Sequence, residues 1–83
     1  MKILYFAWVR QKIGRSEENV DAPASVRTAG ELATWLMRRG NGYAEAFADL
    51  KRLRVAINQE HSNFNTPLEA QDEVAFFPPV TGG

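Results

Sequence analysis

The chain has 83 residues, of which 45% are hydrophobic, and its ten basic residues balance ten acidic ones. This length predicts one small domain, and the balanced charge argues against binding to nucleic acid or to an anionic membrane surface. No apolar run approaches the ~20 residues that span a bilayer, and the first apolar segment is too short for a signal peptide, so we expect a cytoplasmic protein.

Cysteine is absent and His61 is the only histidine. These counts exclude disulfides, thiol nucleophiles and thiolate metal sites, and they argue against a catalytic triad within the chain. We therefore expect no bound cofactor or metal, and side chains that do not perform chemistry alone.

The N-terminal segment predicts a pair of strands. Residues 2–9 are rich in aromatic and β-favouring side chains, which indicates a strand near the centre of a sheet. Gly14 marks a turn, and a weaker strand is expected around residues 16–20, antiparallel to the first.

Thr28 and Glu31 have the spacing of a capping box, which predicts the start of a helix. The helix is expected to place Arg38 and Arg39 in its last turn, where they favour its C-terminus, and to end at Gly40. Its apolar positions at helical spacing are Leu32, Trp35 and Leu36, and we expect Trp35 in the core.

The second half of the chain predicts a minor helix and further strands. Asn41 and Gly42 should break the chain, and Tyr43, Phe47 and Leu50 then follow at helical spacing. The later segments are a strand at 53–58, a turn-rich stretch at 63–67, a connection at 68–72 that could hold a short strand, and a last strand at 73–77.

About five strands over one main helix indicate an α+β, ubiquitin-like β-grasp fold. The first and last strands are the most apolar and are separated by a long crossover, so they should be parallel neighbours in the middle of the sheet. We expect a domain at residues 1–77 and an extended, flexible tail at 78–83.

The tail combines two rigid residues with two unhindered ones. Pro78 and Pro79 favour an extended path, whereas Gly82 and Gly83 fit a slot too narrow for any side chain. Four residues beyond Pro79 reach roughly 13–14 Å. The alternative is a frayed end, but a frayed end needs neither a stiff neck nor a terminus without side chains.

Three stretches carry a resemblance to a known family: ILYFAWVR at 3–10, VAINQE at 55–60 and DEVAFFPPVTGG at 72–83. Together they resemble the small, sulfur-carrying subunit of molybdopterin synthase over essentially the whole chain. A terminal diglycine occurs in ubiquitin-like proteins of several roles. The run from Asp72 through the two prolines is more specific.

The resemblance implies a mechanism centred on Gly83 and Gly82. An E1-like, ATP-dependent enzyme adenylates the Gly83 carboxylate, which is converted to a thiocarboxylate. The tail then enters the large catalytic subunit and donates sulfur to cyclic pyranopterin monophosphate, in molybdenum cofactor biosynthesis within a heterotetramer. The resemblance implies that the chain itself is a cosubstrate, with no catalytic activity on its own.

Adjacent aromatic residues suggest where such partners dock. Neighbouring strand residues point to opposite faces, so Phe6 and Phe77 could form an exposed patch. The minor helix could equally cover that face. We include Phe6 and Phe77 in the expected partner interface, together with the tail residues Pro78, Pro79, Val80 and Thr81.

Two residues depart from the family's pattern. Gln71 precedes Asp72, at a position where relatives usually have glycine. A turn with positive φ is therefore less favourable at Gln71. His61, expected in an exposed loop, stands where many relatives place an apolar residue, which puts one partner contact in doubt.

Three other functions remain open from the sequence. The chain could carry sulfur for another pathway such as thiazole synthesis, or act as a ubiquitin-like modifier joined to target lysines. It could also be a β-grasp binding module with an inert terminus. The Phe-Phe-Pro-Pro segment at residues 76–79 favours the molybdopterin synthase subunit over the first two of these functions.

Overall fold

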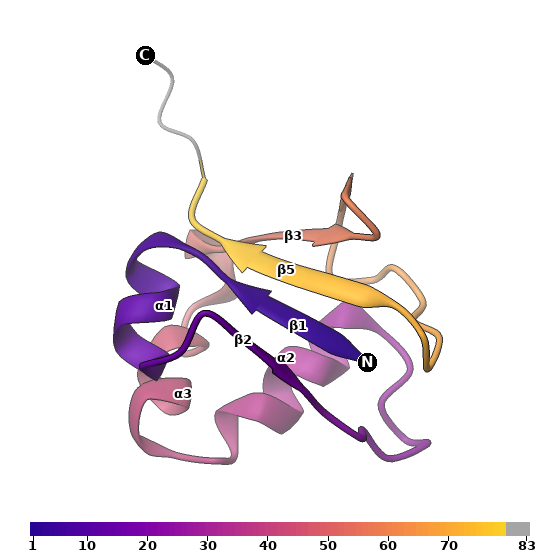
Figure 1. The fold of residues 1–83 in the computed structure, drawn as a ribbon, viewed down its shortest axis with the longest axis horizontal. Helices are drawn as coiled ribbons and strands as arrows, with labels where there is room; N and C mark the ends of the chain where they lie inside the picture. The colour runs from indigo at the N-terminus through magenta and orange to yellow at the C-terminus, as the bar shows by residue number, and fades with distance from the viewer. Residues whose placement is uncertain (80–83) are drawn as a thin grey trace.

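The protein is built around one mixed sheet (Figure 1). The computed structural model describes residues 1–79, so Val80, Thr81, Gly82 and Gly83 lie outside the described residues. The strands follow the order β2 (Glu17–Asn19), β1 (Lys2–Tyr5), β5 (Glu73–Phe77), β3 (Arg54–Ile57) and β4 (Glu60–Ser62). The parallel central pair, β1 and β5, is confirmed, and the other neighbours are antiparallel.

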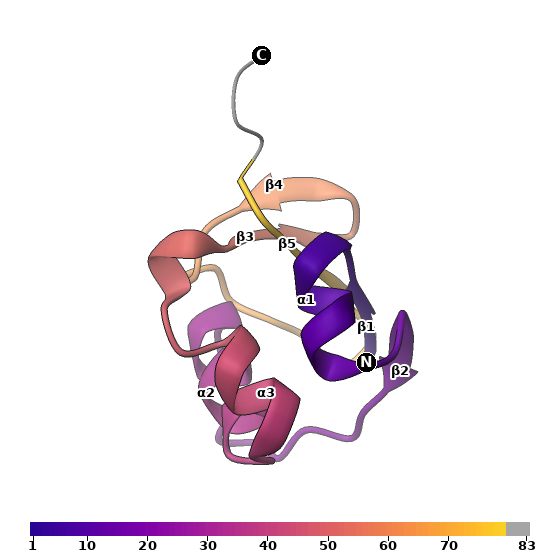
Figure 2. The same ribbon diagram turned by 90° about the vertical axis from the view of Figure 1, so that its left-hand side faces the viewer.

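The helices cover one face of this sheet (Figure 2). They are α1 (Ala7–Ile13), α2 (Ala29–Met37), α3 (Asn41–Ala46) and the 3₁₀ helix η1 (Leu50–Arg52). The predicted α+β, ubiquitin-like β-grasp arrangement is confirmed, with α2 as its longest helix. No helix within residues 1–79 is long and apolar enough to cross a membrane.

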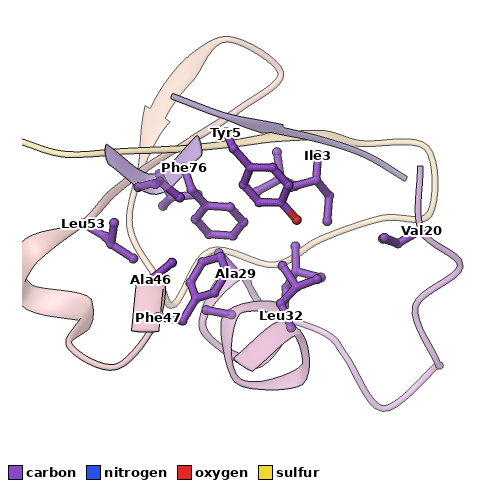
Figure 3. Close-up of a cluster of buried hydrophobic side chains, with 14 of the residues drawn as sticks. Ile3, Tyr5, Val20, Ala29, Leu32, Ala46, Phe47, Leu53 and Phe76 are labelled. Atoms are coloured by element: carbon purple, nitrogen blue, oxygen red, sulfur yellow. The ribbon is translucent and has the colours of Figure 1, made fainter. Parts of the chain in front are cut away.

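The covered face of the sheet carries the hydrophobic core (Figure 3). The buried Phe76 ring stacks beside Tyr5 with centroids 6.4 Å apart, and it meets Phe47 edge-on at 4.9 Å. Side chains alternate along a strand, so β5 directs Val74 and Phe76 into the core and leaves Phe77 on the other face.

The first strand is shorter than predicted, because it ends at Tyr5 and not at Val9. Ala7 adopts a left-handed backbone angle, φ 53°, and α1 begins there. The Phe6 amide still donates to the Phe76 carbonyl at 3.1 Å, and the Val9 amide then donates back to the Phe6 carbonyl. Burial of Val9 in the core overrides the β-propensity of the segment.

The short extra strand lies at β4, and residues 68–72 form none. β4 pairs with β3 through a two-residue turn at Asn58 and Gln59, which have φ values of 51° and 69°. Such a turn requires positive φ at both central residues, and glycine is its usual signal. Neither residue is glycine, so the sequence pattern does not reveal this hairpin.

The capping box of α2 is confirmed. The Glu31 amide donates to Thr28 Oγ1 at 3.1 Å, and the Thr28 amide donates to Glu31 Oε1 at 3.1 Å. The helix ends at Met37, earlier than predicted. Gly40, with φ 78°, directly precedes α3, so Asn41 begins a helix where the sequence predicts a break.

Helices α1 and α3 approach too closely for a side chain at Gly42. A Cβ added there would overlap the main-chain carbonyl oxygen of Lys12. Glycine therefore permits the contact that holds α1 against the rest of the helical layer.

Candidate functional site

The open face of the sheet carries a shallow hollow of about 540 Å³ that runs along β5, from Glu73 at its start to Phe77 at its end. Its apolar lining consists of Leu4, Phe6, Ala56, Ala75 and Phe77, and its polar lining of Gln59, His61 and Glu73. Strand alternation explains the small side chains: the core takes the large residues of β3 and β5, and alanines face outward. The sequence indicated only the two phenylalanines of this surface.

Phe6 is 46% exposed and is the only exposed large hydrophobic side chain within residues 1–79. Phe77 is half-buried and meets the His61 ring edge-on, with centroids 5.4 Å apart. The minor helix does not cover this face, because Phe47 at its end packs against Phe76 in the core. The alternative of a covered patch is therefore wrong, whereas a role in partner binding remains a prediction.

The tail leaves the domain beside this hollow. Phe77, the last residue of β5, pairs with Arg54, the first residue of β3. Pro78 and Pro79 follow and are half-buried. Proline has no amide hydrogen, so the ladder between β5 and β3 cannot continue past this point. The remaining predicted site residues, from Val80 to Gly83, lie outside the described residues.

Two stretches that carried the family resemblance meet in space through Asn58. Its Nδ2 donates to Asp72 Oδ1 at 3.0 Å, and its Oδ1 accepts from the Glu73 amide at 3.0 Å. The Asn58 amide also donates to the Glu73 carbonyl at 2.8 Å. Asn58 therefore fixes the β3–β4 hairpin against the start of β5, which is a supporting role at the end of the sheet away from the tail.

The structure also places the two residues that depart from the family's pattern. Gln71 lies in the turn before β5 and has no positive φ. The turn closes instead through Asp72 Oδ2, which accepts from the Glu69 amide at 2.8 Å. His61 is exposed as expected, but it lies in β4 and not in a loop, and its side chain contributes to the hollow.

A partly buried carboxylate forms a separate polar cluster on the covered side. Glu18 accepts from Tyr5 at 2.8 Å, Tyr43 at 2.6 Å and Arg39 at 2.7 Å, and its side chain is 8% exposed. Arg39 was predicted to favour the end of the helix, but it reaches across to Glu18. Its guanidinium also lies 5.1 Å from the centre of the Trp35 ring, which is half-buried and packs against the core.

These hydrogen bonds determine the protonation of the cluster. Burial opposes ionisation of Glu18, but the hydrogen bonds from Tyr43, Arg39 and Tyr5 outweigh it and hold the pKa of Glu18 below its ordinary value. Burial first, and then the bond to Glu18, raises the pKa of Tyr5 and of Tyr43. The cluster therefore keeps one protonation state near neutral pH and joins elements of the fold. Within residues 1–79 no group of three potential metal ligands occurs.

Known proteins share both the sequence pattern and the fold. The model of the ThiS family matches residues 3–83. This chain belongs to the ThiS family. One ThiS-family relative, the molybdopterin synthase sulfur carrier subunit of Escherichia coli (strain K12), is 41% identical over 83 residues, and the match covers 100% of this chain and 99% of the relative.

Solved structures match the ThiS-family chain over nearly its whole length. SAMP1 from Haloferax volcanii has a TM-score of 0.73 at 26% identity, covering 100% of this chain and 98% of the other. A chain from the complex of subunits 1 and 2 of molybdopterin-converting factor from Helicobacter pylori has a TM-score of 0.63 at 25% identity, covering 99% and 96%. The resemblance recognised in the sequence is thereby confirmed.

Proposed function

We propose that this chain is the sulfur carrier subunit of a molybdopterin synthase. The observation that carries the proposal is the 41% identity, along the full chain, with a relative of that name. The position of the tail supports it, since β5 ends beside an uncovered apolar hollow. A carrier whose end enters another protein needs a docking surface at that place.

The reacting group in this proposal is the Gly83 carboxylate. It attacks the α-phosphorus of ATP on an E1-like activating enzyme, which releases pyrophosphate and leaves an acyl adenylate. A sulfur nucleophile at the oxidation level of sulfide then displaces AMP and forms the thiocarboxylate. Gly82 and Gly83 have no Cβ, so neither face of the carbonyl is hindered by a side chain.

The second half of the cycle returns the chain to its starting state. The thiocarboxylate sulfur bonds to a side-chain carbon of cyclic pyranopterin monophosphate in the large catalytic subunit and displaces an oxygen substituent from that carbon. Water then hydrolyses the resulting thioester, which leaves the sulfur on the pterin and returns the Gly83 carboxylate. Repeated transfers build the dithiolene that holds molybdenum. The chain is a regenerated cosubstrate, and the sulfurtransferase activity belongs to the heterotetramer with two large subunits.

The open face supplies the contacts to both partners in turn. Phe6 and Phe77 would pack against the activating enzyme or the large subunit, while Pro78 and Pro79 direct Val80 and Thr81 into its recess. The Helicobacter pylori structure, a complex of subunits 1 and 2, supports the large subunit as a partner.

Intact mass spectrometry tests the chemistry. The protein is incubated with the activating enzyme, ATP and a sulfur donor, and its mass is compared with that of a variant lacking Gly83. We expect a gain equal to replacement of one oxygen by sulfur, located at Gly83 and absent from the variant. No gain with a competent activating enzyme would contradict the proposal.

The same mass measurement, followed by addition of each acceptor and an assay of the variant lacking Gly83, separates the other functions. A much larger conjugate containing a target protein would indicate a ubiquitin-like modifier. A thiocarboxylate that is consumed only by a thiazole-forming acceptor would indicate the other pathway. Full function of the variant without Gly83 would indicate a binding module with an inert terminus.

A further inference from the structure

The directions of the central strands bring three segments to the end of the sheet where the tail begins. β1 and β5 run in parallel toward this end, and β3 starts there, with Arg54 opposite Phe77. α1 follows β1, and η1 comes immediately before β3, so these two helices flank the end of β5 (Figures 1 and 2). η1 and the first residue of β3 therefore lie at the same end of the sheet as the start of the tail.

This end of the molecule concentrates exposed cations. Lys51, Arg52 and Arg54 are all exposed, and within residues 1–79 none of them has a carboxylate at salt-bridge distance. Four cations have such partners, namely Lys2, Lys12, Arg15 and Arg39, whereas Arg10, Arg27 and Arg38 are exposed and, within residues 1–79, also have none at this distance. We call Lys51, Arg52 and Arg54 the basic collar.

Two residues of the basic collar are held in place by contacts within the domain. The Arg52 guanidinium lies 5.3 Å from the centre of the Trp8 ring in α1, so it bridges the two helices that flank the tail. The Arg54 guanidinium donates to the carbonyls of Lys51 at 3.2 Å and Leu53 at 2.8 Å. Neither contact neutralises the positive charge.

Four acidic residues lie at the opposite end of the sheet, whereas one, Asp49, lies beside the collar, where its Oδ1 accepts from the Lys51 amide at 3.0 Å. Glu69, Asp72 and Glu73 lie where β5 begins, and Glu60 lies in the hairpin that Asn58 fixes against them. Because the whole chain has no net charge, the separation of these groups makes the tail end positive relative to the far end.

We propose that the basic collar binds carboxylates around the mouth of the recess through which the large synthase subunit receives the tail. The inference rests on the proposed function, because it assumes that the tail enters that subunit. Arg54 lies beside Phe77, so the collar is continuous with the apolar hollow and the two can meet one partner surface. Opposite charges around such a contact steer association and orient the partners.

The chain's overall charge favours an acidic protein surface over a polyanion. A nucleic acid or an anionic membrane would also meet the acidic far end, and three cations on a chain with no net charge give little long-range attraction. A local rim of carboxylates on a folded partner would meet the collar and the part of the hollow at Phe6 and Phe77, whereas Glu73 lies at the other end of the hollow.

Binding to the purified large subunit tests the collar. The double variant Arg52→Glu with Arg54→Glu is compared with the wild type at low and high salt by titration calorimetry and stopped-flow association. Arg27→Glu is the control. Arg27 is exposed and lies before α2, where its carbonyl accepts from the Leu68 amide. Thermal unfolding verifies that each variant is folded.

We expect the double variant to bind at least roughly tenfold more weakly at low salt, mainly through slower association, and the difference to shrink at high salt. Arg27→Glu should bind like the wild type. Arg52→Glu alone should show the same pattern with a smaller loss, and it leaves the Arg54 contacts intact. Equal affinity of wild type and double variant at low salt, or a loss that does not depend on salt, would overturn the proposal.

A second readout separates failure of the collar from failure of the proposed function. This readout is the transfer of sulfur from the thiocarboxylated wild type to cyclic pyranopterin monophosphate at saturating large subunit, measured separately from binding. The wild type could bind with an affinity that depends on salt and on the collar, and yet transfer no sulfur to cyclic pyranopterin monophosphate. That result would contradict the proposed sulfur-carrier function and support the role of the collar in binding. Absence of any wild-type binding would overturn both.

Discussion

The two faces of the central sheet are built from alternate residues of the same strands, yet they differ in what covers them. Phe76 is fully buried beneath Tyr5 and against Phe47, whereas Phe77, the next residue, lines the open hollow with Phe6. The comparison shows that one short strand can contribute both to the core and to a docking surface. Stability and partner binding should therefore be separable by substitutions one position apart.

The largest expected effect comes from truncating the two phenylalanines in turn. Phe76→Ala leaves a cavity in the core and should lower the free energy of unfolding by about 3–5 kcal/mol. Phe77→Ala removes a half-buried ring and should cost about 1 kcal/mol or less, while weakening binding to the large subunit. Urea unfolding and calorimetric titration measure the two quantities. Equal destabilisation by both variants would contradict the division between the faces.

Gly42→Ala should disturb the covered side without touching the open face. The added methyl group overlaps the Lys12 carbonyl, so α1 and α3 must move apart, and we expect a loss of about 1–3 kcal/mol in unfolding free energy. Gly14→Ala is a useful comparison because its Cβ would meet no neighbour, and only its φ of 88° opposes the change. If Gly42→Ala unfolds like the wild type, the close approach of the two helices is wrong.

Glu18→Gln should remove a charged acceptor from a site with three donors and lower stability by about 1–3 kcal/mol at neutral pH. The pKa of Glu18 is lower in the folded state than in the unfolded state, so its contribution is fully present above the unfolded pKa. This contribution is lost as the pH falls through the folded pKa.

The difference in free energy of unfolding between Glu18→Gln and the wild type should therefore become smaller in acid, because the glutamine does not titrate. Urea unfolding across this pH range measures the difference. A gap that stays constant as Glu18 becomes protonated would show that its charge contributes nothing. Binding to the large subunit serves as the control, and it should be unchanged because Glu18 lies on the covered side.

The smallest expected effect is a gain. Ala7 holds a positive φ of 53°, which disfavours any residue with a Cβ, so Ala7→Gly should raise the free energy of unfolding by about 1 kcal/mol. Ala7→Val should lower it, since a β-branched residue is more restricted in this region. Thermal melting of the pair measures both changes, and a gain from valine would contradict the assigned backbone angle.

The sequence predicts those parts of the fold that depend on local signals. The sequence predicts β5 with its observed bounds, since a short continuous apolar run from Val74 to Phe77 is closed by Pro78 and Pro79. The capping box at Thr28 is equally local. In both cases the residues that define the element lie within a few positions of one another.

The remaining features depend on contacts between distant residues. The turn at Ala7 forms because α1 buries Val9, and the hairpin at Asn58 is stabilised by Asp72, so neither has a local signal. Arg39 was assigned to its own helix because its partner, Glu18, is 21 residues away. For the hollow, the sequence indicated Phe6 and Phe77 but could not place the alanines of β3 and β5 beside them.

The most direct test of the account is a single-turnover sulfur transfer. The thiocarboxylated chain is mixed with the large subunit and cyclic pyranopterin monophosphate, and both product and carrier mass are followed. We predict that dithiolene product forms as the Gly83 carboxylate returns, and that Phe77→Ala slows the reaction at low concentrations of large subunit. A thiocarboxylate that survives intact beside a competent large subunit and its substrate would contradict the account.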